Sequence, residues 1–252
     1  MLKLMKYELR KTWFVKLILL GVTAVAEIIF LIGLYGRYED TLAVGSTFLL
    51  FLLAFCGLTV IGIASVVVLH RDMNTRQGYM LFMTPNSCYK ILGAKVLECG
   101  ISILLAGAFF FALGALDVSL VFARQGMLNL MWQRIQEALS HMTFAGRPIQ
   151  LNLSVYSALG FSILTSWFST VMTAYLADVI SSALLNGKKF NGLISFLFFI
   201  ALSWGLSKLI TLAVGGIGEI VPYLWVYSLC SLAVAAVMYF VTARIMEKHL
   251  SV

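Results

Sequence analysis

The sequence predicts an all-α polytopic membrane protein with six transmembrane helices and both termini in the cytoplasm. Hydrophobic residues make up 61% of its 252 residues and charged residues only 12%. An ordinary soluble domain has roughly 45–50% apolar and about 25% charged residues. The apolar residues fall in continuous runs, whereas the strands of a membrane β-barrel alternate in hydrophobicity. We therefore expect a single transmembrane domain over residues 1–252.

Six runs reach the length of about 20 apolar residues that an α-helix needs to cross the hydrocarbon core. The loops between them differ in charge: thirteen Lys and Arg residues fall on the side of the two termini and four on the opposite side. The positive-inside rule therefore places both termini in the cytoplasm. The predicted spans are residues 14–35, 47–69, 93–116, 155–178, 190–214 and 221–243.

Two segments outside the spans are predicted to form amphipathic helices in the membrane interface. Residues 1–13 combine an apolar stripe with basic side chains, either as a topology anchor or as an elbow helix beside a cytoplasmic partner. In the external connection, residues 125–142 carry an apolar face around Trp132, with Gln133 and Glu137 on the opposite side. Both helices would lie parallel to the membrane surface.

The cytoplasmic connection of about residues 70–92 mixes charged side chains with aromatic and Met side chains. Thr84 and Pro85 match an N-cap followed by the first helical position. A continuous helix from Pro85 into the third span would be about 48 Å long, well over the ~30 Å hydrocarbon core. The loop is therefore expected to project into the cytoplasm, either to dock into a cleft on another protein or to cover its own helix ends.

A Gly-rich segment, residues 212–222, connects the fifth and sixth predicted spans. It contains three glycines and a proline among apolar residues. One interpretation is backbone that dips back into the membrane, which is tolerated only where protein or a water-filled cavity satisfies it. The other is a tight hairpin between two long helices.

Two charged residues fall inside the predicted spans, Glu27 in the first and Lys208 in the fifth. Each would cost about 2.5–3.5 kcal/mol at the bilayer centre on insertion scales, so each should face protein or water. Their depths allow an ion pair between the two helices. A substrate contact is the alternative for both, and Lys208 alone could extend its ammonium outward to the interface.

Several functions find no support in the sequence. It contains no GxxxxGK[ST] phosphate loop, no HExxH or GxSxG motif, and its three histidines lie outside the spans. We therefore expect a non-catalytic protein that binds no metal or cofactor itself. The net charge of +7 comes from basic cytoplasmic loops and does not indicate nucleic-acid binding.

The segment Arg71-Asp72 … Gly78-Tyr79-Met80-Leu81-Phe82-Met83-Thr84-Pro85 … Tyr89-Lys90-Ile91-Leu92-Gly93-Ala94-Lys95-Val96-Leu97-Glu98 resembles type-2 ABC exporter permeases. In that family a similar run lies between the second and third spans. The chain also resembles these permeases in layout, with a basic amphipathic start, six spans and a Gly-rich hairpin before the sixth. Among them it looks most like permeases of bacterial peptide exporters, such as exporters of phenol-soluble modulins and bacteriocin-immunity systems.

The resemblance implies a transmembrane subunit of a bacterial cell membrane that pairs with a second permease copy and with two ATP-binding-cassette subunits. ATP and Mg would then be held by those partner subunits. It also implies that the cytoplasmic loop contains a coupling helix seated on the ATPase, and that Glu27 and Lys208 lie at the dimer interface or translocation path. The residues expected to couple to the ATPase are Arg71, Asp72, Arg76, Tyr79, Met80, Phe82 and Met83.

Two functions remain open at this point. The first is ATP-driven export, in which an amphipathic or antimicrobial-type peptide is favoured as cargo because the spans are rich in Phe and Leu. The second is ion-coupled transport of a hydrophobic or lipid-like substrate without an ATPase, for which intramembrane charges are also suitable.

Overall fold

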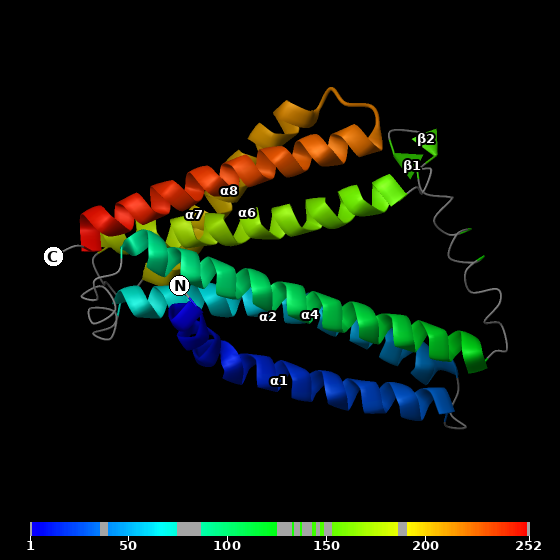
Figure 1. Ribbon diagram of the computed structural model, residues 1–252. Coiled ribbons are helices and arrows are strands. Elements are labelled where there is room, and N and C mark those ends of the chain that lie inside the picture. Colours follow the sequence, from blue (N-terminus) through cyan, green and yellow to red (C-terminus); the bar gives the residue numbers. More distant parts are fainter. Residues whose placement is uncertain are drawn as a thin grey trace. The chain divides into compact units, whose positions relative to one another are not determined.

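The computed structural model describes residues 2–35, 40–74, 87–124, 133, 137, 143–144, 147–148, 153–185 and 191–250. This part of the chain is almost entirely helical, as Figure 1 shows. Its elements are α1 (Leu2–Tyr35), α2 (Asp40–Asn74), α4 (Cys88–Arg124), α6 (Leu153–Leu185), α7 (Asn191–Val214), α8 (Ile220–Leu250) and the short strands β1 (Thr143–Phe144) and β2 (Arg147–Pro148).

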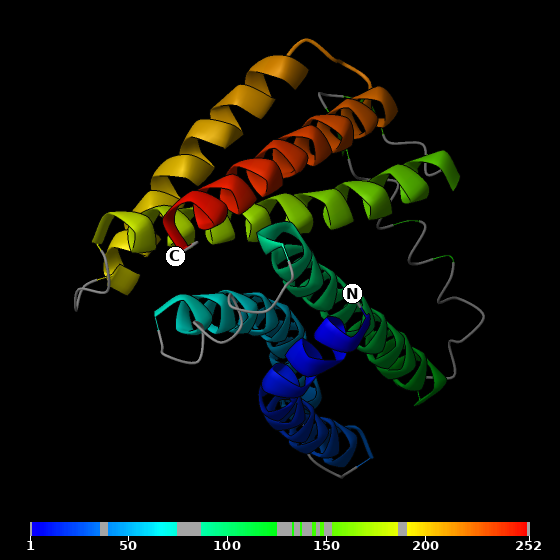
Figure 2. The ribbon, with the colours of Figure 1, turned by 60° about the vertical axis from the view of Figure 1, so that its left-hand side comes forward.

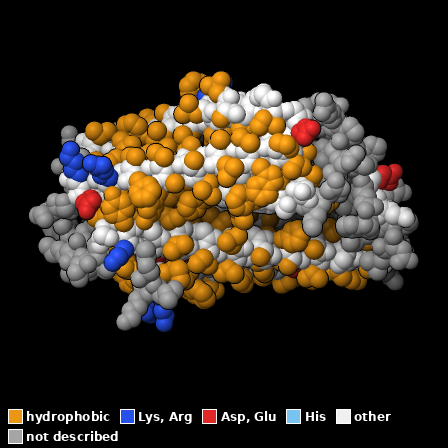
Figure 3. All heavy atoms as spheres, turned by 45° about the horizontal axis from the view of Figure 1, so that its top comes forward, with side chains coloured by type: hydrophobic (Ala, Val, Ile, Leu, Met, Phe, Trp, Pro, Cys, Tyr) orange, Lys and Arg blue, Asp and Glu red, His pale blue; other side chains and the backbone are white. Residues whose placement is uncertain are grey.

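All six helices are long and apolar enough to cross a membrane, which makes the chain a multi-pass membrane protein. Hydrophobic side chains cover much of the helical surface on the face shown in Figure 3, with few charged side chains among them. Helix α4 has 37 residues, or about 56 Å, and exceeds the predicted third span at both ends. Helices continue past the hydrocarbon core because their hydrogen bonds close within the segment whatever the side chains are.

Contacts between residues group the chain into two compact units, residues 1–65 with 97–135 (unit 1) and residues 66–96 with 136–252 (unit 2). The single transmembrane domain expected from the sequence stays a prediction. In unit 1 the core is formed by Ala26, Phe30 and Leu34 on one face of α1, together with Leu50 of α2. Partly buried side chains of α1, α2 and α4 pack around it, namely Leu31, Leu53, Leu113, Leu120 and Val121.

A glycine allows close packing in unit 1. A Cβ atom at Gly57 of α2 would lie only 2.9 Å from Leu19 Cδ1 of α1 and 3.2 Å from the ring of Phe110 in α4. Small residues of this kind let membrane helices approach each other closely. Gly57 therefore fits its position because any side chain there would force Leu19 and Phe110 to shift.

In unit 2, α6 packs against both α7 and α8 and has its most extensive contacts with α8. Helices α6 and α8 run side by side in Figures 1 and 2. The fully buried side chains include Met172 and Tyr175 of α6, Met246 of α8, and Ile91 and Leu92 of α4. α6 is thus the most buried of the six helices and forms the centre of the packing in unit 2.

The link between α7 and α8 is short. α7 ends at Val214 and α8 begins at Ile220, with the amide of Ile217 donating to the carbonyl of Val214 at 3.1 Å. A Cβ atom at Gly215 would lie 2.9 Å from the carbonyl oxygen of Thr211. The segment therefore has the form of a tight hairpin between two long helices.

The two predicted interfacial helices are described only in part. Residues 4–13 form the start of the continuous helix α1, which bends near its N-terminal end (Figure 1). Most of the predicted helix 125–142 lies outside the described residues, but Gln133 and Glu137 are both helical and exposed. The later strands β1 and β2 pair antiparallel, with Thr143 opposite Pro148.

Candidate functional site

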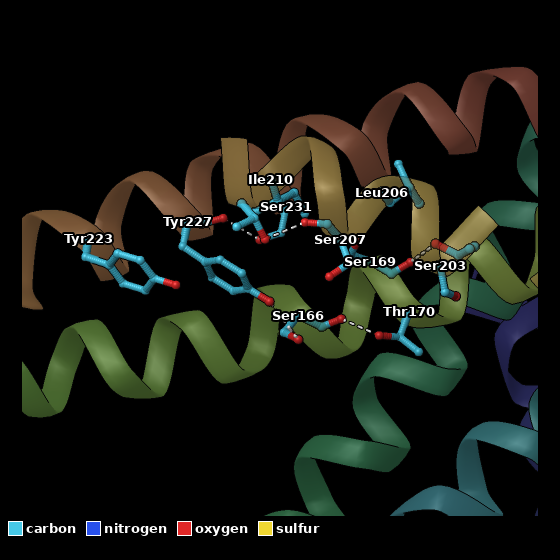
Figure 4. Close-up of a pocket in the computed structure, with 12 residues that line it drawn as sticks. Ser166, Ser169, Thr170, Ser203, Leu206, Ser207, Ile210, Tyr223, Tyr227 and Ser231 are labelled. Carbon is cyan, nitrogen blue, oxygen red and sulfur yellow. Dashed lines mark hydrogen bonds between the residues drawn. The ribbon is translucent and has the colours of Figure 1, made fainter. Parts of the chain in front are cut away.

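Three helices of unit 2 enclose a polar cavity of about 180 Å³. Side chains of α6, α7 and α8 converge on it, as Figure 4 shows. Of the twelve described residues that line it, ten carry a hydroxyl group and none is charged. Polar cavities between the helices of a membrane bundle are common substrate sites. The lining residues are Ser166, Ser169, Thr170, Thr173, Ser203, Leu206, Ser207, Ile210, Thr211, Tyr223, Tyr227 and Ser231.

The cavity has a buried inner wall and an exposed mouth. Ser169, Thr173 and Ser231 are all buried. Thr170 and Thr211, which also line the cavity, are exposed. A small molecule or chemical group can therefore reach the inner wall from one side.

Several lining hydroxyls donate their proton to the backbone of their own helix. Thr170 and Thr211 each donate to the carbonyl four residues earlier, at 2.9 and 2.7 Å, and Thr173 does the same at 2.8 Å. Ser231 donates to the carbonyl of Tyr227 at 2.9 Å. Each hydroxyl has one proton and two lone pairs. These oxygens therefore face the cavity chiefly as hydrogen-bond acceptors.

Two tyrosines of α8 form one end of the cavity. The rings of Tyr223 and Tyr227 are stacked, with centroids 6.4 Å apart and planes 9° apart. The hydroxyl of Tyr227 points across to α6, where its oxygen lies 3.5 Å from the Oγ atom of Ser166 (Figure 4). The cavity thus offers aromatic faces beside its hydroxyl oxygens.

Sequence analysis missed this site, although the chain carries a signal for it. Ser203, Ser207 and Thr211 follow each other at four-residue spacing and so share one face of α7. Ser166 and Thr170 repeat the same spacing on α6. Hydropathy and charge alone do not detect such a pattern, because Ser and Thr are near neutral on both measures.

A second group of contacts in unit 2 fixes the two ends of the loop between α2 and α4. Lys95 of α4 donates a hydrogen bond to Asp72 at the end of α2, and the Nζ and Oδ2 atoms are 2.5 Å apart. The side chain of Lys95 is 2% exposed and that of Asp72 is 11% exposed. This ion pair joins the two helices at the start and end of the loop.

The same helix ends are also tied to α6 and α8. His70 Nδ1 of α2 lies 2.6 Å from Oδ1 of Asp178 in α6. The hydroxyl of Tyr239 in α8 donates to the backbone carbonyl of Tyr89 in α4 at 2.7 Å, and the two rings are 6.4 Å apart. Both ends of the loop are therefore connected to helices that line the hydroxyl cavity.

In unit 1, a polar cluster joins the first half of α1 to α4. The buried carboxylate of Glu98 accepts hydrogen bonds from Thr12 and Lys16, both at 2.7 Å, and from Ser102 at 2.9 Å. Lys16 also donates to the hydroxyl of Ser102 at 2.6 Å. The charge of Glu98 is thus balanced by a lysine and two hydroxyl donors, and the cluster fixes the packing of α1 on α4.

Within unit 1, the neighbour of Glu27 of α1 is a second carboxyl group. Its carboxyl group lies close enough to that of Asp117 in α4 for the two to interact. Glu27 Oε2 and Asp117 Oδ1 are buried without a hydrogen-bond partner in the described part of the chain. Two ionised carboxylates in contact repel, so such a pair is stable when one of them carries a proton.

Lys208 of α7 is exposed, and its ammonium lies 6.0 Å from the ring centroid of Trp204. Glu27 and Lys208 belong to different units, and a pairing between them stays a prediction. Asp117 did not appear among the expected site residues because it follows directly on the predicted third span.

The predicted coupling residues are only partly described. Arg71 and Asp72 lie in the last turn of α2. Thr84 and Pro85, the predicted helix start, fall outside the described residues, and α4 is described from Cys88 onward. The other predicted coupling residues, Arg76, Tyr79, Met80, Phe82 and Met83, also lie outside the described residues.

Within the described ranges, no group of three or more His, Cys, Asp or Glu side chains is placed to hold a metal ion. No known protein-family model matches the chain, and neither the curated proteins nor the solved structures contain a detectable relative. The hydroxyl cavity and the contacts around it therefore have to be interpreted from their own residues.

Proposed function

We propose that the chain is the permease subunit of an ATP-driven ABC exporter in a bacterial cell membrane. In this proposal a second copy of the permease completes the translocation path, and two separate ATP-binding subunits hold ATP and Mg. The chain itself has no catalytic role. The sequence support is the resemblance of residues 71–98 to type-2 ABC permeases. The cargo proposed from that resemblance is an amphipathic peptide.

The observation that carries the proposal is the set of contacts around the loop between α2 and α4. Asp72 and Lys95 hold the two ends of the loop together. Through His70 and Asp178 one end is tied to α6, and through Tyr89 and Tyr239 the other end is tied to α8. A partner that pulls on this loop would therefore move the two helices that flank the hydroxyl cavity.

The loop residues take distinct roles in this mechanism. The aromatic pair Tyr79 and Phe82 is proposed to insert into a cleft of the ATPase, since desolvated aromatic side chains are frequent hot spots of interfaces. Arg71, Arg76, Met80 and Met83 would complete the docking surface. Asp72 is already engaged by Lys95 and would fix the loop.

The proposal is tested by purifying the tagged chain from its native membranes and measuring ATP hydrolysis. We expect the chain to co-purify with an ATP-binding-cassette protein and the complex to hydrolyse ATP. We also expect inverted membrane vesicles to take up a fluorescent amphipathic helical peptide when ATP is supplied. ATP hydrolysis by the chain alone, or peptide uptake that does not depend on ATP, would contradict the proposal.

The carboxyl pair of Glu27 and Asp117 favours a second candidate, an ion-coupled transporter of a hydrophobic or lipid-like substrate. Carboxyl pairs inside membrane proteins often serve in proton relays. This candidate predicts that a proton gradient across ATP-free proteoliposomes drives uptake and that a protonophore abolishes it. The ABC proposal predicts no uptake under those conditions.

A further inference from the structure

We propose that the hydroxyl-lined cavity between α6, α7 and α8 binds a primary ammonium group carried on an apolar tail, namely the amine end of the transported molecule. This inference rests on the export function proposed above and specifies the chemistry of the substrate at that site. It is argued from the hydrogen-bonding groups that line the cavity, from their charge and from the volume of the cavity.

Five of the ten lining hydroxyls already donate their protons to other protein atoms, so these oxygens are available to a ligand only as acceptors. Thr170, Thr173, Thr211 and Ser231 already donate their protons to backbone carbonyls, and the hydroxyl of Tyr227 is directed at Ser166. The other described lining residues are five hydroxyl residues, which can donate or accept, and two aliphatic residues, and no Lys, Arg, His, Asn or Gln adds a stronger donor. A ligand that matches such a surface brings donors of its own. An ammonium group has three donors and no acceptor.

The described lining offers no positive charge to an anionic ligand, and its acceptor oxygens and aromatic faces suit a cationic one. Among the described residues, no cationic side chain lines the cavity, and the ammonium of Lys208 lies 6.0 Å from the ring centroid of Trp204. A buried carboxylate or phosphate needs a paired positive charge as well as hydrogen bonds, and the described lining supplies no such charge. An ammonium would gain charge-assisted hydrogen bonds to several oxygens and attraction to the aromatic faces of Tyr223 and Tyr227.

The size of the cavity limits the ligand to a head group. Its volume of about 180 Å³ is below the roughly 300–1,000 Å³ of sites that enclose a drug-sized molecule. Leu206 and Ile210 add an apolar wall beside the oxygens. The cavity is therefore suited to an amine with a few attached methylene groups, while the remainder of the molecule lies outside it.

The test compares three probes of equal length that differ only in the head group: butylammonium, 1-butanol and butyrate. Each is titrated calorimetrically at neutral pH into the purified full chain in phosphatidylcholine nanodiscs, with protein-free nanodiscs as the blank. We expect butylammonium to bind at least about tenfold more tightly than butanol, because hydrogen bonds to charged groups are stronger. Butyrate should bind most weakly. Equal affinities for butylammonium and butanol would overturn the inference.

A matched pair of variants assigns the binding to the cavity. The double variant Thr170→Val and Thr211→Val removes two lining oxygens while keeping side-chain volume, and should weaken butylammonium binding about tenfold. The control, Thr59→Val with Ser119→Ala, removes two hydroxyls that also donate to backbone carbonyls but lie in unit 1. It should leave the affinity unchanged. If the Thr double variant does not fold, Ser207→Ala serves in its place. Unchanged affinity in the cavity variant would refute the site.

Two further comparisons distinguish cargo binding from lipid binding and this inference from the export proposal. In nanodiscs that contain phosphatidylethanolamine, a lipid with its own primary ammonium, butylammonium should still bind. Its complete displacement there would assign the cavity to a lipid head group and overturn the assignment to cargo. Because the titrations need no ATPase, their outcome does not depend on whether the export proposal is correct. An ATP-driven exporter that binds no butylammonium would refute this inference alone.

Discussion

Lys95 and Asp72 form an ion pair whose Nζ and Oδ2 atoms are 2.5 Å apart, and this pair joins the start of α4 to the end of α2. The thirteen residues 75–87 that separate these helices include most of the predicted docking residues. The pair therefore fixes the distance between the two ends of a loop whose proposed role is to transmit movement. Contacts of the same helix ends with Asp178 and Tyr239 extend that connection to α6 and α8.

Breaking the Asp72–Lys95 pair should destabilise the protein. Removing one partner of a buried ion pair typically costs about 3–5 kcal/mol, because the other charge remains buried, whereas replacing both is often close to neutral. We expect Lys95→Met to lower the melting temperature in detergent and Asp72→Asn to do so as well. The double variant should recover much of the loss. Lys90→Met, which alters an exposed lysine of the same helix, is the control and should change little.

The contact of Tyr239 with Tyr89 should matter more for coupling than for stability. Tyr239→Phe keeps the ring and removes a hydrogen bond worth about 1 kcal/mol. In the proposed complex we expect near-normal ATP hydrolysis with reduced transport per ATP. Tyr156→Phe on α6, where the side chain is 46% exposed, is the matched control. A transport-to-hydrolysis ratio unchanged by Tyr239→Phe would exclude this contact from the coupling route.

The loop aromatics give a direct test of docking. Replacing Tyr79 and Phe82 together by Ala should abolish co-purification with the ATPase while membrane insertion stays intact, since interface anchors are typically worth roughly 2 kcal/mol or more each. The control replaces Tyr156 and Phe168, two exposed aromatics of α6, by Ala. If the loop variant still binds the ATPase and transports at the normal rate, the loop is not the docking element.

Glu27 has two candidate partners, Asp117 and Lys208, and double-mutant cycles distinguish between them. The structure brings its carboxyl close to that of Asp117, and the sequence allows a pair with Lys208 as one of its alternatives. If the two carboxyls share a proton, Glu27→Gln keeps a hydrogen-bonded pair and should cost less than about 1 kcal/mol. Glu27→Gln and Asp117→Asn should then be non-additive in melting temperature, while Glu27→Gln and Lys208→Met should be additive. The reverse pattern would favour the ion pair with Lys208.

Two adjacent glycines in the hairpin between α7 and α8 differ in the space around them. A Cβ atom at Gly215 meets the carbonyl oxygen of Thr211 at 2.9 Å, whereas one at Gly216 meets nothing within 4 Å. Gly215→Ala should therefore destabilise the protein by about 1 kcal/mol or more, because the close atom belongs to the backbone. Gly216→Ala should be close to neutral. Equal melting temperatures for the two variants would contradict this account of the turn.

The amino-acid sequence by itself determined the membrane class and the six helices. An uninterrupted apolar run of sufficient length satisfies the backbone only as a helix, so the prediction needs no tertiary contact. For the same reason it identified the positions of all six spans, whereas it left open whether residues 212–222 form a re-entrant segment or a hairpin. The helix ends were less accurate: α4 extends to Arg124, because a helix does not end where hydrophobicity ends.

Only the tertiary structure decided which polar side chains come together. Asp72 and Lys95 are 23 residues apart, His70 and Asp178 are 108 apart, and Tyr89 and Tyr239 are 150 apart. No local pattern specifies these partners, because they depend on which helix faces pack against each other. The hydroxyl cavity is the clearest case. Four-residue spacing puts Ser203, Ser207 and Thr211 on one face of α7, but the packing of α6 and α8 against that face makes it a cavity.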